Sequence, residues 1–226
     1  MNRRSAACST LWAALAAVMF CAPLQGLAQG TAPVPFYQPE DATAGLYRTH
    51  TAPLARTFAE QAPALVQALQ KHCEGPANLP AARTAWTNTM LAWEGLAAVA
   101  VGPLVERRSL RSIDFQPLRP ELLQRMLARS PRTLDDMVRV GTPAKGLPAL
   151  EWLLWTRPVQ PGSPACSYAH EVAQDVARES AALQAAFTTA AGTDWGAEDE
   201  QEQSTQAISE FVNQWVGGIE RLRWAQ

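Results

Sequence analysis

Apolar residues recur at helical spacing along most of the chain, and the clearest run lies in its first third. Its members are three or four positions apart: Leu54, Phe58, Ala62, Leu65, Leu69 and Cys73. Such spacing places the side chains on one face of an α-helix. Pro63 lies inside this run, and proline in a helix interior predicts a kink or a split into two pieces.

A second helix is expected between Asn78 and Gly102. Asparagine is a frequent N-cap residue, Pro80 suits a first turn, and Gly102-Pro103 provides a stop signal. The apolar stripe consists of Ala82, Trp86, Met90, Trp93 and Ala97. We interpret its two tryptophans as core residues rather than as part of a ligand site.

The remaining pattern is less regular at first and then helical again. Between Val105 and Ser130 the stripe weakens, and we expect a loop that ends at Pro120. Short helices should follow over residues 122–127 and 134–138. The segment from Gly146 to Trp155 is apolar on nearly all sides and should form a central, buried helix.

Two long helices complete the prediction. One should span about 166–190, and the last should run from about Gln201, with an interruption at Gly217-Gly218. No segment shows the alternation of polar and apolar residues that is typical of a β-strand. We therefore expect an all-α fold, a helical bundle with an irregular middle loop region.

Residues 1–28 have the pattern of a secretory signal peptide. Arg3-Arg4 precedes an apolar stretch, Leu11–Leu24, and Gly26-Leu27-Ala28 offers the small residues that a signal peptidase reads. We expect export to the periplasm or cell envelope, cleavage near Ala28 and no transmembrane span afterwards. Lipidation at Cys21 is the minor alternative, because a large residue precedes that cysteine.

This division leaves residues 29–45 as an extended lead and residues 46–226 as one helical domain. The formal net charge of −2 provides no basic field, so nucleic acid is not expected as a partner. The chain stops directly after a helical pattern, and it is interpreted as either a short form or a truncation at the C-terminus. In a truncated chain the last helix would lack partners and expose Phe211, Trp215 and Ile219.

Two cysteines, Cys73 and Cys166, remain once the signal peptide is removed. A lone pair in an oxidising compartment most often forms one disulfide. Two buried free thiols are the alternative.

Glu151 is the best single pointer to chemistry, because it lies in a run of Leu and Trp. A carboxylate among apolar side chains is costly unless donors or a cation meet it. In a structural interpretation it accepts hydrogen bonds from buried donors, with five candidates: Arg107, Arg108, Arg111, Trp86 and Trp93.

In a functional interpretation Glu151 belongs to a ligand cleft. Carboxylate oxygens would there hold iron or another divalent metal, and the cleft would consist of Glu94, Asp114, Glu151 and Arg111. His170, Glu171 and Asp175 could also share a helical surface, although a solvated face is the preferred interpretation of those three.

Five segments, taken in order, resemble the imelysin-like family of bacterial cell-envelope proteins, also called the M75 peptidase family. They are HCEGP, ARTAWTNTMLAWEG, RSIDFQP, KGLPALEWLLW and CSYAHEVAQDVARE. The resemblance implies an exported, all-helical protein that is often linked with iron supply. It also implies a Gly-x-His-x-x-Glu motif, proposed in the family as a metal or catalytic centre. The matching residues here are Gly146, Pro148 and Glu151, with proline in place of the histidine.

Proline has no lone pair to offer a metal and cannot move a proton, whereas a zinc hydrolase needs about three protein ligands and an open position for water. We therefore expect a non-catalytic binding or accessory protein in iron, metal or haem supply. Its expected partners are cell-envelope iron-uptake components. The alternative is a metal-dependent hydrolase of the M75 type with an altered motif.

Overall fold

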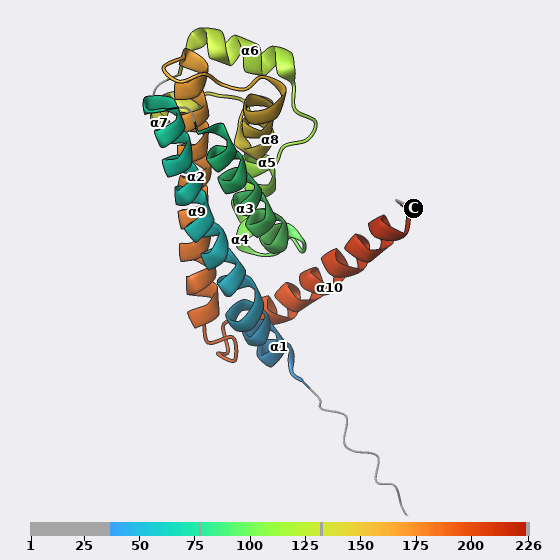
Figure 1. Ribbon diagram of the computed structural model, residues 1–226. Coiled ribbons are helices and arrows are strands. Elements are labelled where there is room, and N and C mark those ends of the chain that lie inside the picture. The colour runs from blue at the N-terminus through green and yellow to red at the C-terminus, as the bar shows by residue number, and fades with distance from the viewer. Residues whose placement is uncertain (1–36, 77, 132, 225–226) are drawn as a thin grey trace, which may run out of the picture. The chain divides into compact units, whose positions relative to one another are not determined.

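The computed structural model describes residues 37–76, 78–131 and 133–224; the predicted signal peptide lies outside them. Within these ranges every regular element is helical and no β-strand is present (Figure 1). The all-α prediction is therefore confirmed. In the same ranges, no helix is both long enough and apolar enough to cross a membrane.

Three long helices form the centre of the bundle: α2 (Ala52–Glu74), α3 (Leu79–Ala97) and α9 (Pro164–Gly192). α2 packs against both of the others. Phe58 of α2 and Trp93 of α3 are buried with their ring centroids 5.3 Å apart, and large aromatic side chains contribute heavily to core burial. α2 runs through Pro63 without being split, and Pro63 is exposed, so its ring faces solvent rather than the core.

The N-terminal part of the described chain corrects one prediction. Residues 29–45 were expected to be extended, but Pro39–Gly45 form helix α1, which continues into a π-helix, η1 (Leu46–Thr51). Pro39, Glu40 and Asp41 lie in the first turn of α1. Proline is common at this position, and acidic side chains are stabilised there by the positive end of the helix dipole. Seven residues are too few to show a periodic stripe.

The middle region contains more helix than expected. Within the segment predicted as a loop ending at Pro120, two short helices form, α4 (Pro103–Glu106) and α5 (Ser109–Ile113). After residues 114–119 come α6 (Pro120–Arg129), α7 (Leu134–Val138) and a short 3₁₀ turn, η2 (Thr142–Ala144). α4 and α5 are separated by Arg107-Arg108 and carry no apolar stripe, whereas α7, which is equally short, carries Leu134, Met137 and Val138 and was predicted.

The predicted central helix is present as α8 (Gly146–Glu151) followed by a second π-helix, η3 (Trp152–Thr156). Residues 146–150 are all buried, as the apolar pattern predicts. The helix packs on α9 and α3.

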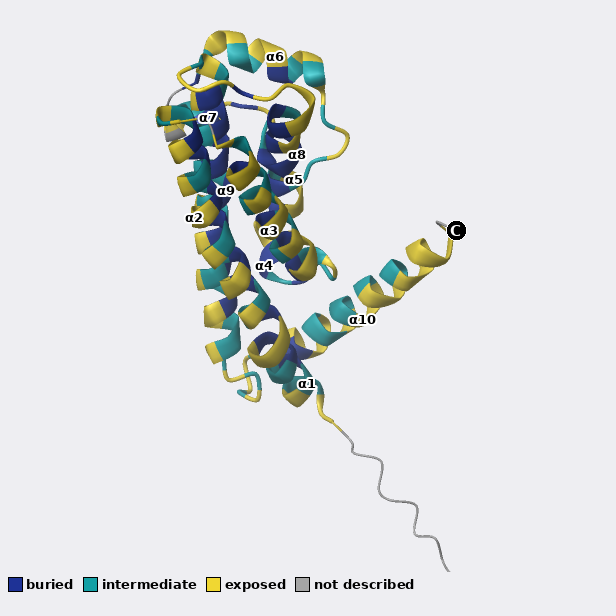
Figure 2. Ribbon diagram, in the orientation of Figure 1, coloured by how far each residue is buried: buried dark blue, intermediate teal, exposed yellow. Residues whose placement is uncertain are grey.

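The last helix, α10 (Gln201–Trp224), is not interrupted at Gly217-Gly218. It packs mainly on α1, where buried Thr43 donates a hydrogen bond to the carbonyl oxygen of Ser204 at 2.8 Å. Beyond that contact its apolar residues are largely open to solvent (Figure 2). Trp215 is 53% and Ile219 49% exposed, while Phe211 is half-buried.

A disulfide between Cys73 and Cys166 joins the end of α2 to the start of α9, with the two Cα atoms 5.6 Å apart. The prediction of one bond is confirmed. The backbone N–H of Gly162 donates to the carbonyl oxygen of Cys73 at 3.0 Å, and the neighbouring His72 is buried. The His72 ring accepts from the N–H of Asn78 and bonds to the carbonyl oxygen of Val159, both at 3.0 Å, so its two nitrogens are satisfied structurally.

Candidate functional site

The motif segment begins at Gly146, whose backbone conformation only glycine adopts easily. Its φ angle is +80°, and a Cβ atom placed there would lie 2.4 Å from the carbonyl oxygen of Ile113. Left-handed φ values are unfavourable for other L-residues. Gly146 therefore lets the motif segment approach the end of α5 directly, and this explains why the RSIDF and KGLPALE segments meet.

The residues around Gly146 are held through backbone carbonyl groups. The indole Nε1 of Trp86 donates to the carbonyl oxygen of Leu147 at 3.0 Å, and the hydroxyl of Tyr168 donates to that of Ala144 at 2.6 Å. Pro148, which follows Leu147, is buried. These bonds fix the turn without using any side chain of the motif.

Glu151 does not lie where the sequence predicts. It is the last residue of α8, it is exposed, and it makes no side-chain hydrogen bond or ion pair with the described residues. Two of its expected donors bind elsewhere, Trp86 to Leu147 and Arg107 to Glu179. The interpretation of Glu151 as a buried, bonded carboxylate is wrong, because α8 passes into the π-helix at this residue and its outer side meets solvent.

The other residues of the predicted ligand cleft are also separate. Glu94 is exposed on α3, Asp114 accepts a hydrogen bond from the side chain of Gln116 at 3.3 Å, and the Arg111 guanidinium lies 5.9 Å from the Phe115 ring centroid. Within the described ranges, no three or more His, Cys, Asp or Glu side chains form a group that could hold a metal ion. The structure therefore does not bring Glu94, Asp114 and Glu151 together as a metal centre.

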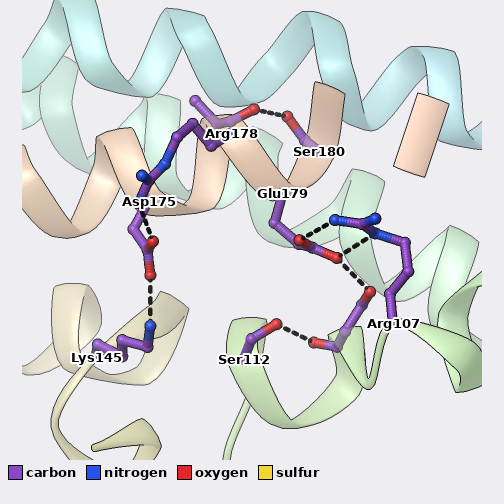
Figure 3. A network of polar contacts seen from close by, with 9 residues as sticks. Arg107, Ser112, Lys145, Asp175, Arg178, Glu179 and Ser180 are labelled. Carbon is purple, nitrogen blue, oxygen red and sulfur yellow. Dashed lines mark hydrogen bonds and ion pairs between the residues drawn. The ribbon is translucent and has the colours of Figure 1, made fainter. Parts of the chain in front are cut away.

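Close to the motif, a network of polar contacts joins carboxylates on α9 to side chains from other segments (Figure 3). Glu179 receives two bonds from Arg107, at 3.0 Å from Nε and 2.8 Å from Nη2, and a third from the hydroxyl of Ser109 at 2.6 Å. This bidentate pairing raises the pKa of the Arg107 guanidinium. These contacts attach the segment that contains α4 and α5 to helix α9.

One turn earlier on α9, Asp175 forms ion pairs with two basic side chains. Lys145, directly before the motif glycine, donates from Nζ at 2.8 Å, and Arg178 binds the other carboxylate oxygen. The Lys145 and Asp175 side chains are only 11% and 18% exposed, so solvent screens this pair less than a surface pair. A cavity of about 420 Å³ adjoins both ion pairs, with Ser112 and Ile113 also in its wall.

The network corrects the interpretation of Asp175 as part of a solvated face with His170 and Glu171. Asp175 and Glu179 are four residues apart on α9, so they lie on the same side of that helix. Both are half-buried, and they hold the segment of α4 and α5 and the residue before Gly146, Lys145. The sequence signal was a pair of carboxylates beside the buried residues Val172 and Val176, but their basic partners are distant in sequence and cannot be identified from it.

Comparison with known proteins agrees with this fold. A solved imelysin-like protein from Psychrobacter arcticum 273-4 has a similar fold, with a TM-score of 0.68 at 18% sequence identity, over 80% of this chain. The match covers 59% of that protein, so this chain spans about three fifths of its length. No match was found among curated proteins. The family model for imelysin, peptidase family M75, matches residues 51–225, and the chain therefore belongs to the imelysin family.

Proposed function

We propose that this protein is an exported, periplasmic or cell-envelope binding or accessory protein in iron, metal or haem supply, and that it does not hydrolyse peptides through its motif. The observation that carries the proposal is Pro148. It stands at the position of the family's motif histidine and is buried. A proline supplies neither a ligand atom nor a group that transfers a proton.

The residues of the motif do not fit a metal centre. Glu151 alone offers a ligand oxygen, and its side chain is exposed at the end of α8. Among the described residues, no fully buried side-chain nitrogen or oxygen lacks a hydrogen-bond partner, so no orphaned ligand atom faces Pro148. We derive no catalytic step through a metal at this motif.

Two features support export. The bond between Cys73 and Cys166 is typical of a protein that matures in an oxidising compartment, and the first 28 residues have the pattern of a signal peptide. The proposed partners are cell-envelope components of iron uptake. The link with iron rests on family membership.

The test uses mature protein purified from the periplasm. Elemental analysis and titration with iron and zinc measure metal binding, and digestion of casein with and without a chelator measures hydrolysis. We expect no chelator-sensitive cleavage, and the same metal content in Glu151→Gln as in a control, Glu94→Gln, which removes another exposed carboxylate.

Chelator-sensitive cleavage that Glu151→Gln abolishes and Glu94→Gln retains would contradict the proposal. It would show that the protein is a metal-dependent hydrolase with a rebuilt centre. Pro148→His provides a further test, because restored metal binding without cleavage would indicate that this turn is a metal-holding element whose ligand the chain has lost.

A further inference from the structure

A second cavity lies away from the motif, between the N-terminal half of α10 and the segments that carry Tyr47 and Gly102. Its volume is about 570 Å³, within the range of small-molecule sites. Its polar wall includes hydroxyl, carboxylate and amide groups from Tyr47, Glu106, Gln206, Glu210, Asn213 and Gln214. We refer to this cavity as the amide cleft.

The charged side chains that line the amide cleft are all acidic. Glu106 and Glu210 are both in its wall, and no lysine, arginine or histidine is among the residues that line it. Neither carboxylate makes an ion pair or a side-chain hydrogen bond with the described residues. Glu106 is exposed and Glu210 is half-buried. With no basic residue in the wall, they give the cleft a negative potential, which favours a positively charged occupant.

Tyr47 is an independent sign of a ligand. It lies on the π-helix η1, and its residue is only 3% exposed. Its ring stacks on Trp195, with centroids 5.3 Å apart, while its hydroxyl has no hydrogen-bond partner in the part of the chain that the structure describes. Since that part contains no fully enclosed, unpartnered polar side-chain atom, the hydroxyl reaches a solvent-accessible space, and the amide cleft is a cavity that Tyr47 lines.

Gly102 makes room for this hydroxyl. A Cβ atom at Gly102 would lie 2.5 Å from the Tyr47 oxygen, and the φ angle of Gly102 is +46°. Burial, with the nearby charges of Glu210 and Glu106, raises the pKa of Tyr47 to about 12. The phenol therefore remains neutral at physiological pH and can accept a hydrogen bond from a ligand N–H group.

We propose that the amide cleft binds a small organic cation with at least two amino groups. Ammonium groups donate hydrogen bonds and carry positive charge, and the wall offers two carboxylates, a free phenol oxygen and several amide oxygens as acceptors. The cavity is much larger than a single metal ion needs. A neutral polyol would leave both carboxylates without a countercharge.

The experiment measures binding of spermidine to the mature, disulfide-bonded protein by isothermal titration calorimetry at physiological salt. Magnesium and glycerol are the comparison ligands. Glu106→Gln and Glu210→Gln should each weaken spermidine binding about tenfold, and Tyr47→Phe should weaken it several-fold without moving the backbone. Glu94→Gln is the matched control, because it removes one exposed carboxylate that is not among the residues lining the cleft.

Saturable spermidine binding that the cleft variants weaken and Glu94→Gln leaves unchanged would support the proposal. The proposal is overturned by the absence of binding, by equal losses in Glu94→Gln and the cleft variants, or by tighter binding of magnesium or glycerol than of spermidine. Circular dichroism on each variant confirms that a lost signal is not lost folding. None of these outcomes depends on the metal-binding tests of the motif.

Discussion

Replacement of Gly146 by alanine should destabilise the protein strongly, and the structure gives both parts of the cost. An alanine at φ +80° pays about 1–2 kcal/mol for a left-handed conformation. Its Cβ would also lie 2.4 Å from the carbonyl oxygen of Ile113, and relief of such overlap by backbone movement typically costs about 1–3 kcal/mol. We expect a loss of roughly 2–5 kcal/mol in the free energy of unfolding.

Two other glycines separate these contributions. Gly162 also has a positive φ, +72°, but a Cβ there meets nothing within 4 Å, so Gly162→Ala should cost only about 1–2 kcal/mol. Gly45 has a helical φ of −59° and equally open space. Gly45→Ala should therefore be neutral or stabilise the protein by about 0.5–1 kcal/mol.

Urea unfolding followed by circular dichroism, with the disulfide intact, measures all three variants on one scale. The expected order of stability is Gly45→Ala above Gly162→Ala above Gly146→Ala. An equal loss at Gly146 and Gly162 would show that the close approach to Ile113 costs nothing. The explanation of the motif glycine given above would then be refuted.

Three further predictions concern other parts of the chain. Cys166→Ser should lower the free energy of unfolding by about 2–5 kcal/mol, because the bond to Cys73 closes a long loop; equal melting temperatures would contradict this. The raised pKa of Tyr47, about 12 against an ordinary value of about 10, contributes stability that is complete below pH 10 and is lost as the pH rises towards 12. The free energy of unfolding should therefore fall less steeply between pH 10 and about pH 12 in Tyr47→Phe than in the unsubstituted protein. Identical pH profiles would exclude this role. Trp215→Ala should change stability by less than about 0.5 kcal/mol, whereas Trp93→Ala should cost about 3–5 kcal/mol; a large loss at Trp215 in dilute protein would mean that it is covered.

The long helices were predictable because burial follows local periodicity. In α2 the residues at helical spacing, Phe58, Ala62, Leu65 and Leu69, are all fully buried, and such a stripe is visible without knowledge of its partner. The short helices α1, α4 and α5 were missed because none of them carries an apolar stripe of its own, so their formation depends on tertiary packing.

The polar contacts were not predictable in the same way. Lys145 and Asp175 are 30 residues apart and Arg107 and Glu179 are 72 apart, and nothing in either local sequence selects the partner. The same limit applies to the amide cleft, where Tyr47 lines one cavity together with carboxylates from α4 and α10. Side-chain chemistry at long range appears only when the topology is known.

The motif turn itself depends on groups other than the side chains that define the family's motif. Its shape comes from the φ angle of Gly146 and from carbonyl oxygens of Ala144 and Leu147 that accept bonds from Tyr168 and Trp86. A histidine at position 148 would have to bury its imidazole beside Leu147 and Ala149, and the described residues contain no fully buried, unpartnered side-chain nitrogen or oxygen that could bind it. An unpaired buried polar group costs about 1–3 kcal/mol. The fold therefore needs the glycine and the carbonyl groups of this turn, while any chemistry at position 148 is a separate property that the chain can lack without losing its structure.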